Sequence, residues 1–151
     1  PQTNNIFPSM TVEENLEMGG FIRKNGIKET IKQVYELFPV LHEKKSQIAE
    51  NLSGGQRQQL AFGRALMTNP MFLMLDEPSA GVSPIIMDEL FNKVRDISKK
   101  GVSILMVEQN AKQALKISDI GFVLTQGKNK FIDSGKKLLS NPDVRESFLG
   151  G

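Results

Sequence analysis

The chain has 151 residues, of which 39% are hydrophobic and 24% charged, and 19 Lys and Arg against 17 Asp and Glu give a net charge of +2. This length and mixture are typical of about one globular domain and exclude a coiled coil, a collagenous chain and a disordered tail. The interspersed charges give no support for nucleic acid as a partner, and the absence of cysteine excludes a disulfide scaffold, a thiolate zinc site and a cysteine nucleophile.

Helical patterns dominate the first 69 residues. Thr11 followed by Glu14 predicts a capping box that opens a short helix, which the glycines at 19–20 end. A second helix over roughly residues 28–38 carries an apolar stripe and stops before Pro39. We therefore expect a helical lobe at the start of the chain.

From residue 71 the pattern becomes one of short apolar runs that alternate with helices. The runs at residues 71–75 and 102–107 do not alternate with polar residues, which predicts strands buried on both faces of a parallel sheet. An amphipathic helix between them ends at Gly101. A strand at 120–125 leads into another at 130–133, which predicts a hairpin. No run approaches the roughly 20 apolar residues that crossing a bilayer requires.

The first motif with chemical meaning is Leu52-Ser53-Gly54-Gly55-Gln56, which runs directly into a helix. Ser53 can cap that helix and Gln56 can reach back to it, while the two glycines leave the N–H groups of the first turn sterically open. A helix N-terminus of this kind is an anion site. An ordinary capped helix that binds nothing explains the motif equally well when it stands alone.

The second motif is the apolar strand that ends in Asp76-Glu77-Pro78. Open α/β sheets place ligands at the carboxyl ends of their strands. In phosphoryl-transfer sites the first carboxylate holds Mg²⁺ and the next can polarise the attacking water. A solvated acidic turn is the favoured alternative for this motif alone.

The order of the motifs resembles that of an ABC transporter ATPase subunit across essentially the whole chain: Gln2, then Leu52-Ser53-Gly54-Gly55-Gln56, then Leu75-Asp76-Glu77-Pro78, then Ser79-Ala80-Gly81-Val82-Ser83-Pro84. The resemblance implies an α/β fold of the P-loop NTPase (ABC ATPase) type, present in part as a helical subdomain plus part of a RecA-like parallel sheet. It divides the chain into a Q-loop segment (1–10), a helical signature subdomain (11–69) and an α/β portion (70–151).

The same resemblance implies ATP and Mg²⁺ as cofactors and a role for each motif. Gln2 would be the Q-loop glutamine, which touches Mg²⁺ or the attacking water. Residues 53–56 would be the signature that closes on ATP bound to the opposite subunit. Asp76 would hold the metal, Glu77 would be the general base, and residues 79–83 would be the D-loop along the dimer interface.

Four shorter segments narrow the resemblance to the importers of branched-chain amino acids: residues 2–8, 37–41, 107–111 and 148–151. This implies that the helical lobe docks on the transmembrane subunits of a permease, that a second ATPase subunit (identical or different) completes the pair, and that no nucleic acid binds. It also implies a peripheral position on the cytoplasmic face of the plasma membrane.

Three features depart from the family pattern. No phosphate-binding loop of the form G-x-x-x-x-G-K-[ST] occurs in the chain, so we expect these residues alone not to hydrolyse ATP. We expect that an N-terminal portion of the protein, which carries this loop in the family, has been left off or is not represented. Gln109 stands at the switch position, where most members carry a histidine that contacts the γ-phosphate. Glutamine can donate a hydrogen bond but carries no imidazolium charge. Because the Glu-Gln-Asn triplet resembles the branched-chain subgroup, we expect Gln109 to be a site residue, with an ordinary exposed loop glutamine as the alternative. Ser83 stands where many members have Asp.

Two other interpretations compete with the importer subunit. One is an ABC ATPase with no membrane partner, although neither a second ATPase half nor a long coiled coil is present. The other is a non-catalytic fragment that contributes only the signature surface, against which the carboxylates Asp76 and Glu77 argue. The single histidine, His42, lies in a charged stretch and predicts a solvated helix residue rather than a metal ligand.

Overall fold

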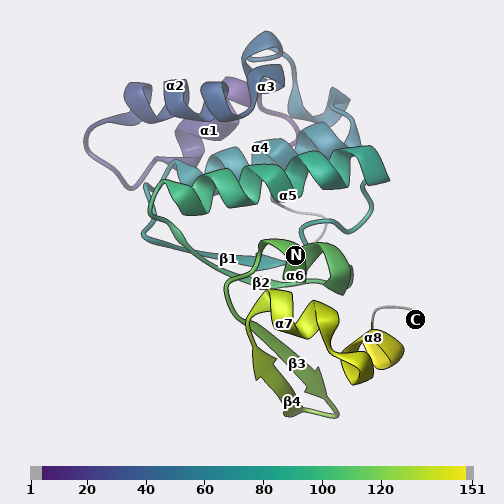
Figure 1. The fold of residues 1–151 in the computed structure, drawn as a ribbon. Helices are drawn as coiled ribbons and strands as arrows, with labels where there is room; N and C mark the ends of the chain where they lie inside the picture. Colours follow the sequence, from purple (N-terminus) through teal and green to yellow (C-terminus); the bar gives the residue numbers. More distant parts are fainter. Residues whose placement is uncertain (1–4, 149–151) are drawn as a thin grey trace. The chain divides into compact units, whose positions relative to one another are not determined.

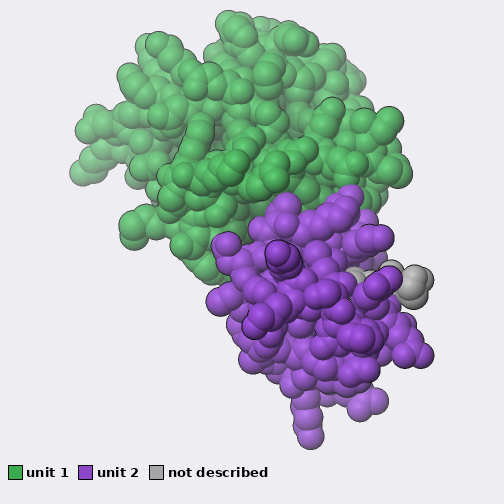
Figure 2. Space-filling model, in the orientation of Figure 1, with its two compact units in different colours: residues 1–105 green, residues 106–151 purple. Residues whose placement is uncertain are grey.

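A computed structural model describes residues 5–148, which fall into two compact units divided between Leu105 and Met106 (Figure 2). The first unit contains α1 (Val12–Gly19), α2 (Ile27–Leu37), α3 (Pro39–Glu43), a 3-10 turn η1 (Ala49–Asn51), α4 (Gly54–Leu66), β1 (Phe72–Asp76) and α5 (Pro84–Lys99) (Figure 1). Strand β2 (Ser103–Val107) spans the boundary between the units. The second unit continues with α6 (Ala111–Ile117), β3 (Gly121–Thr125), β4 (Lys128–Asp133), α7 (Gly135–Ser140) and α8 (Pro142–Phe148).

Helix α1 begins with the predicted capping box. The Thr11 hydroxyl accepts a hydrogen bond from the Glu14 N–H at 3.2 Å, and the Glu14 carboxylate accepts one from the Thr11 N–H at 2.8 Å. The helix ends at Gly19, and Gly20 is its C-cap. The box therefore satisfies two N–H groups that a helix end otherwise leaves without partners, as the sequence predicts.

The core of the first unit lies where α1, α2 and α3 pack on α4 (Figure 1). Gly63 of α4 is the point of closest approach, because a Cβ atom there would lie 2.9 Å from the side chains of both Leu16 and Val34. The rings of Phe38 and Phe62 add a tilted aromatic contact with centroids 6.4 Å apart. Because Gly63 has no side chain, α4 can pack closely against α1 and α2.

The α2 prediction is correct to within one residue at each end. Ile31, Val34 and Phe38 of its apolar stripe are buried, and Tyr35 is half-buried with its ring 4.9 Å from that of His42. His42 is itself exposed, as predicted. The stripe confirms that helical periodicity located the buried face.

The strand pair differs from the prediction in its burial. Strands β1 and β2 share a small parallel sheet in which the Ser103 N–H donates to the Met71 carbonyl at 2.9 Å. Leu73 is buried, but Phe72 and Met74 are 53% and 70% exposed, so burial on both faces is wrong for this chain. Side chains alternate across a strand, and the side chains on the face of Phe72 and Met74 are more exposed than Leu73 on the other face.

Helix α5 and the β3–β4 hairpin form as the sequence predicts. Leu90, Val94 and Ile97 are buried along α5, and Gly101 follows it with φ +92°. The antiparallel hairpin turns at residues 126–127, both with positive φ, which is the backbone of the two-residue turn that matches strand twist. The second unit buries a small core of Leu115, Leu138 and Val144, against which Val123, Phe131 and Leu139 pack.

The boundary between the compact units lies at residues 105 and 106. The sequence-based division at residues 10 and 69 follows motifs rather than compactness and stays a prediction. Among residues 5–148, no helix combines the length and apolar character needed to cross a membrane.

The chain contains a single tyrosine, which makes the environment of Tyr35 directly measurable. Burial, with the carboxylates of Glu13 and Glu17, raises the pKa of Tyr35 to about 12. Because an unfolded tyrosine ionises near a pKa of about 10, folding stability should fall as the pH rises from about 10 to about 12. We expect absorbance titration of the folded chain to show the raised pKa and Tyr35→Phe to remove its share of the alkaline destabilisation. A titration near 10 with helical circular dichroism intact would contradict the packing described here.

Candidate functional site

The signature motif opens helix α4 through a second capping box. The Ser53 hydroxyl accepts a hydrogen bond from the Gln56 N–H at 3.3 Å, and Gln56 Oε1 accepts one from the Ser53 N–H at 3.0 Å. Arg57 also donates to the Leu52 carbonyl. The motif is therefore held in one conformation at the start of a 13-residue helix, as the sequence predicts.

The two glycines of the motif have different surroundings. An ideal Cβ on Gly54 would meet nothing within 4 Å, so the backbone there is open, as expected. A Cβ on Gly55 would lie 2.9 Å from Cγ2 of Ile86, so Gly55 instead allows α5 to approach α4. The chain thus has room for a side chain at Gly54 but not at Gly55, and the openness of the N–H groups in the first turn stays a prediction.

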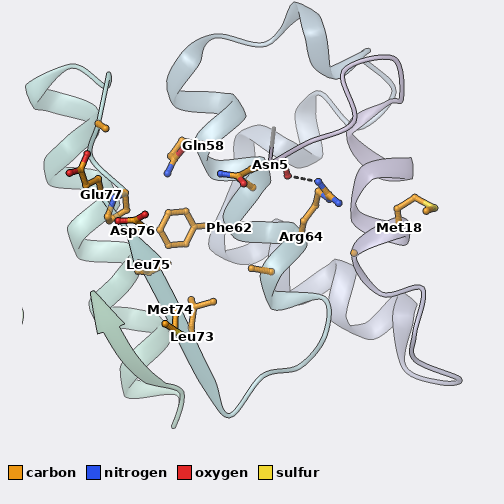
Figure 3. Close-up of a pocket in the computed structure, with 15 residues that line it drawn as sticks. Asn5, Met18, Gln58, Phe62, Arg64, Leu73, Met74, Leu75, Asp76 and Glu77 are labelled. Carbon is orange, nitrogen blue, oxygen red and sulfur yellow. Dashed lines mark hydrogen bonds between the residues drawn. The ribbon is translucent and has the colours of Figure 1, made fainter. Parts of the chain in front are cut away.

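A cavity of about 570 Å³ lies in the first unit between α4, the end of α1 and strand β1 (Figure 3). Helix α4 lines one side of it with residues spaced i, i+3, i+4, i+6 and i+7, most of which lie on one side of a helix. The lining residues are Asn5, Met18, Gly19, Gln58, Ala61, Phe62, Arg64, Ala65, Leu73, Met74, Leu75, Asp76, Glu77, Pro78 and Ala80. The structure thus brings the predicted Asp76 and Glu77 to the wall of a cavity.

Glu77 has an unusual backbone. Its φ is +46°, in the left-handed region that non-glycine residues seldom adopt and that costs about 1–3 kcal/mol. Its carbonyl accepts the Ala80 N–H at 3.0 Å, which begins the turn after β1. Pro78 follows it and is buried. Because a proline favours extended backbone with negative φ at the preceding residue, Pro78 gives no sequence signal of this left-handed conformation.

Asp76 and Glu77 differ in exposure. Asp76 ends strand β1 and is exposed, whereas Glu77 is half-buried.

Figure 3 places the Phe62 ring and the amide side chains of Asn5 and Gln58 around the same cavity. Sequence reasoning missed Asn5 and Gln58. Gln58 could have been found from helical spacing, because it lies three and four residues before Ala61 and Phe62.

The signature residues Ser53–Gln56 do not line this cavity. Ser53 and Gly54 are exposed at the start of α4, whereas Asp76 and Glu77 lie beside the middle of that helix. Of the predicted D-loop, Ala80 reaches the cavity, Ser79 is buried, Gly81 and Ser83 are exposed, and Val82 is half-buried. Within one chain, the two principal motifs therefore point to separate surfaces.

Two further predicted site residues are Gln109 and Gln2. Gln109 is exposed in the second unit, where its carbonyl accepts the Ala111 N–H at 2.9 Å. The next residue, Asn110, caps α6 by accepting the Gln113 N–H at 3.2 Å. Gln2 lies outside the described residues, so its role stays a prediction.

The donors in the cavity suit a metal that is shared with a ligand. No group of three or more His, Cys, Asp or Glu side chains within residues 5–148 could hold a metal ion by itself. Mg²⁺ usually takes one or two carboxylates and completes its shell with phosphate oxygens and water. The Asp76-Glu77 pair therefore fits Mg²⁺ bound together with a phosphate compound.

Comparison with known proteins gives matches to one family. The profile of the family described as ABC transporter matches residues 1–80. A high-affinity branched-chain amino acid transport ATP-binding protein of Pseudomonas aeruginosa is 47% identical over 100% of this chain and 65% of its own length. A probable branched-chain amino acid transport ATP-binding protein of Archaeoglobus fulgidus is 38% identical over 99% of this chain and 64% of its own length.

Solved structures agree with this match. The ADP conformation of an ATP-binding cassette of an ABC transporter superposes with a TM-score of 0.78 at 30% identity, over 100% of this chain and 66% of that one. The chain thus spans slightly less than two thirds of the length of the relatives that it matches.

The different surroundings of the two signature glycines can be tested by alanine substitution. We expect Gly55→Ala to lower the free energy of unfolding by about 1 kcal/mol or more, because its Cβ overlaps Ile86. Gly54→Ala, the matched control, should be neutral or slightly stabilising, since alanine favours the helix. In the Ile86→Ala background, Gly55→Ala should lose most of its penalty in urea unfolding. Equal penalties for both glycines would contradict the α4–α5 contact.

Proposed function

Since the chain belongs to the ABC transporter family, we propose that it forms part of an ATP-binding and ATP-hydrolysing subunit of an importer for branched-chain amino acids. The observation that carries this proposal is the cavity in which β1 ends in Asp76 and Glu77 beside the helix that the signature motif opens. The two named relatives, at 47% and 38% identity, support the substrate class.

We assign Asp76 to the metal and Glu77 to the attacking water. Mg²⁺, when bound, neutralises charge on the phosphates of ATP. Asp76 is exposed at the strand end, where a carboxylate oxygen can bind the ion directly or through water. Glu77 is half-buried and lines the cavity, which suits a general base that must reach a water molecule there.

The signature motif is proposed to bind the phosphates of ATP that a second ATPase subunit holds. Ser53–Gln56 present a helix N-terminus, whose N–H groups and dipole favour a phosphate. These residues do not line the cavity of Asp76 and Glu77, which supports action on another subunit's nucleotide. The exposed part of residues 79–83 is then available for the interface between the subunits.

The helical lobe is proposed to dock on the transmembrane permease subunits at the cytoplasmic face of the membrane. Phe21 and Ile22, between α1 and α2, are 78% and 80% exposed, and Met18 nearby is 39% exposed. Exposed apolar side chains that gather on one surface mark interaction sites more often than single ones do. This supports a protein contact at that end of the lobe.

The assignment of Glu77 is tested in the full-length protein with Glu77→Gln. Loss of a general base should reduce ATP turnover by about 10²- to 10⁴-fold, while nucleotide binding stays near wild type.

The 151 residues alone should show no turnover, because they lack the phosphate loop. Hydrolysis by these residues that Glu77→Gln abolishes would contradict the requirement for that loop.

The assignment of the signature is tested with Ser53→Arg. A long side chain at the exposed start of α4 should block the approach of a second subunit and remove the ATP-dependent dimer of the Glu77→Gln protein on size-exclusion chromatography. Thr68→Arg, a substitution just beyond the other end of α4, is the matched control, since Thr68 is also exposed. A normal ATP-bound dimer of the Ser53→Arg variant would count against this assignment.

A further inference from the structure

We propose that Asn15 and Arg64 are positioning residues that clamp residues 5–7 onto the helical lobe and thereby set one wall of the cavity that holds Asp76 and Glu77. The effect on catalysis rests on the proposed function, whereas the clamp itself rests only on contacts within the first unit. Neither residue was singled out by its sequence pattern.

Asn15 holds the backbone of Phe7. It is fully buried in α1, and its Oδ1 accepts the Phe7 N–H at 2.7 Å. Its Nδ2 donates to the Phe7 carbonyl at 2.9 Å and to the Thr11 carbonyl at 2.9 Å. A buried amide with both its donor and its acceptor directed at the same residue fixes that residue's backbone from both sides.

Arg64 holds the same segment from α4. Its guanidinium donates to the Asn5 carbonyl, as Figure 3 shows, and lies 4.4 Å from the centroid of the Phe7 ring. Arg64 is half-buried, and its Nε atom is buried with no hydrogen-bond partner among the described residues. Burial lowers the pKa of Arg64 from its ordinary value.

The two clamps converge on Phe7 from different helices. Asn15 binds its backbone, and Arg64 contacts its ring and the carbonyl two residues earlier. Asn5 and Arg64 both line the cavity that Asp76 and Glu77 reach. A displacement of residues 5–7 therefore changes the shape of that cavity.

The chemistry of the clamp argues against a purely structural contact. A half-buried guanidinium with an unpaired N–H costs free energy that an apolar contact between Phe7 and α4 would avoid. Hydrogen bonds are directional, so these polar groups fix where the backbones of Asn5 and Phe7 lie. A shift of about 1 Å in the residues that position a reacting group can lower the rate of the reaction by about 10²-fold.

The test uses Arg64→Met, Arg64→Lys and Asn15→Ala in the full-length protein. We expect Arg64→Met and Asn15→Ala to lower kcat for ATP by about tenfold to a hundredfold with KM nearly unchanged. Arg64→Lys should restore part of kcat, because a lysine keeps one charged donor for the Asn5 carbonyl but loses the planar contact with Phe7. The double variant Asn15→Ala/Arg64→Met should be little worse than either single variant, since both act through one segment.

Arg23→Met is the matched control. Arg23 also donates side-chain hydrogen bonds in the first unit, to the Thr30 hydroxyl at 2.7 Å and to the Met67 carbonyl at 2.9 Å, and neither bond goes to residues 5–7. We expect it to lower the melting temperature without lowering kcat. If Arg64→Met and Arg23→Met lower kcat equally, or if Arg64→Met leaves kcat unchanged, the positioning role is overturned.

Hydrogen exchange separates the clamp from the proposed function. The Phe7 amide, which donates to Asn15, should lose protection in Asn15→Ala and Arg64→Met while α4 keeps its protection. Retained protection in both variants would overturn the clamp. A wild-type protein without ATP turnover would overturn the proposed function, and the exchange experiment would still decide whether the clamp exists.

Discussion

The close approach of α4 to α1 and α2 at Gly63 is the contact on which the rest of the first unit depends. A side chain at that position would overlap Leu16 and Val34. The depth at which α4 sits determines where Phe62 and Arg64 lie along the cavity. The same helix carries Ser53 at its start, so one packing distance places both the signature and one wall of the carboxylate cavity.

Much of the fold follows from local patterns in the sequence. The capping boxes at Thr11 and Ser53, the buried stripe of α2 and the turn at Gly127 are all set by residues within a few positions of one another. Such short-range interactions can be predicted from the sequence without knowledge of the tertiary structure. The family assignment likewise rests on motifs that are contiguous in the chain.

What the sequence did not reveal depends on contacts between distant positions. The lack of space for a side chain at Gly55 comes from Ile86, which is 31 residues later in the chain, and Arg64 reaches Asn5 across a separation of 59 residues. The exposure of Phe72 and Met74 also differs from the pattern, because an apolar run shows that a strand suits burial but not whether both its faces are covered. Tertiary partners decide such features.

The uncovered face of β1 has a consequence for handling the chain in solution. Phe72 and Met74 project from a strand next to Met71, which is 86% exposed, in a run without charge before Asp76. Exposed apolar side chains that lie next to one another favour association with the apolar surfaces of other molecules. Preparations of these residues alone should therefore self-associate as concentration rises, and dilute samples are the appropriate ones for spectroscopy.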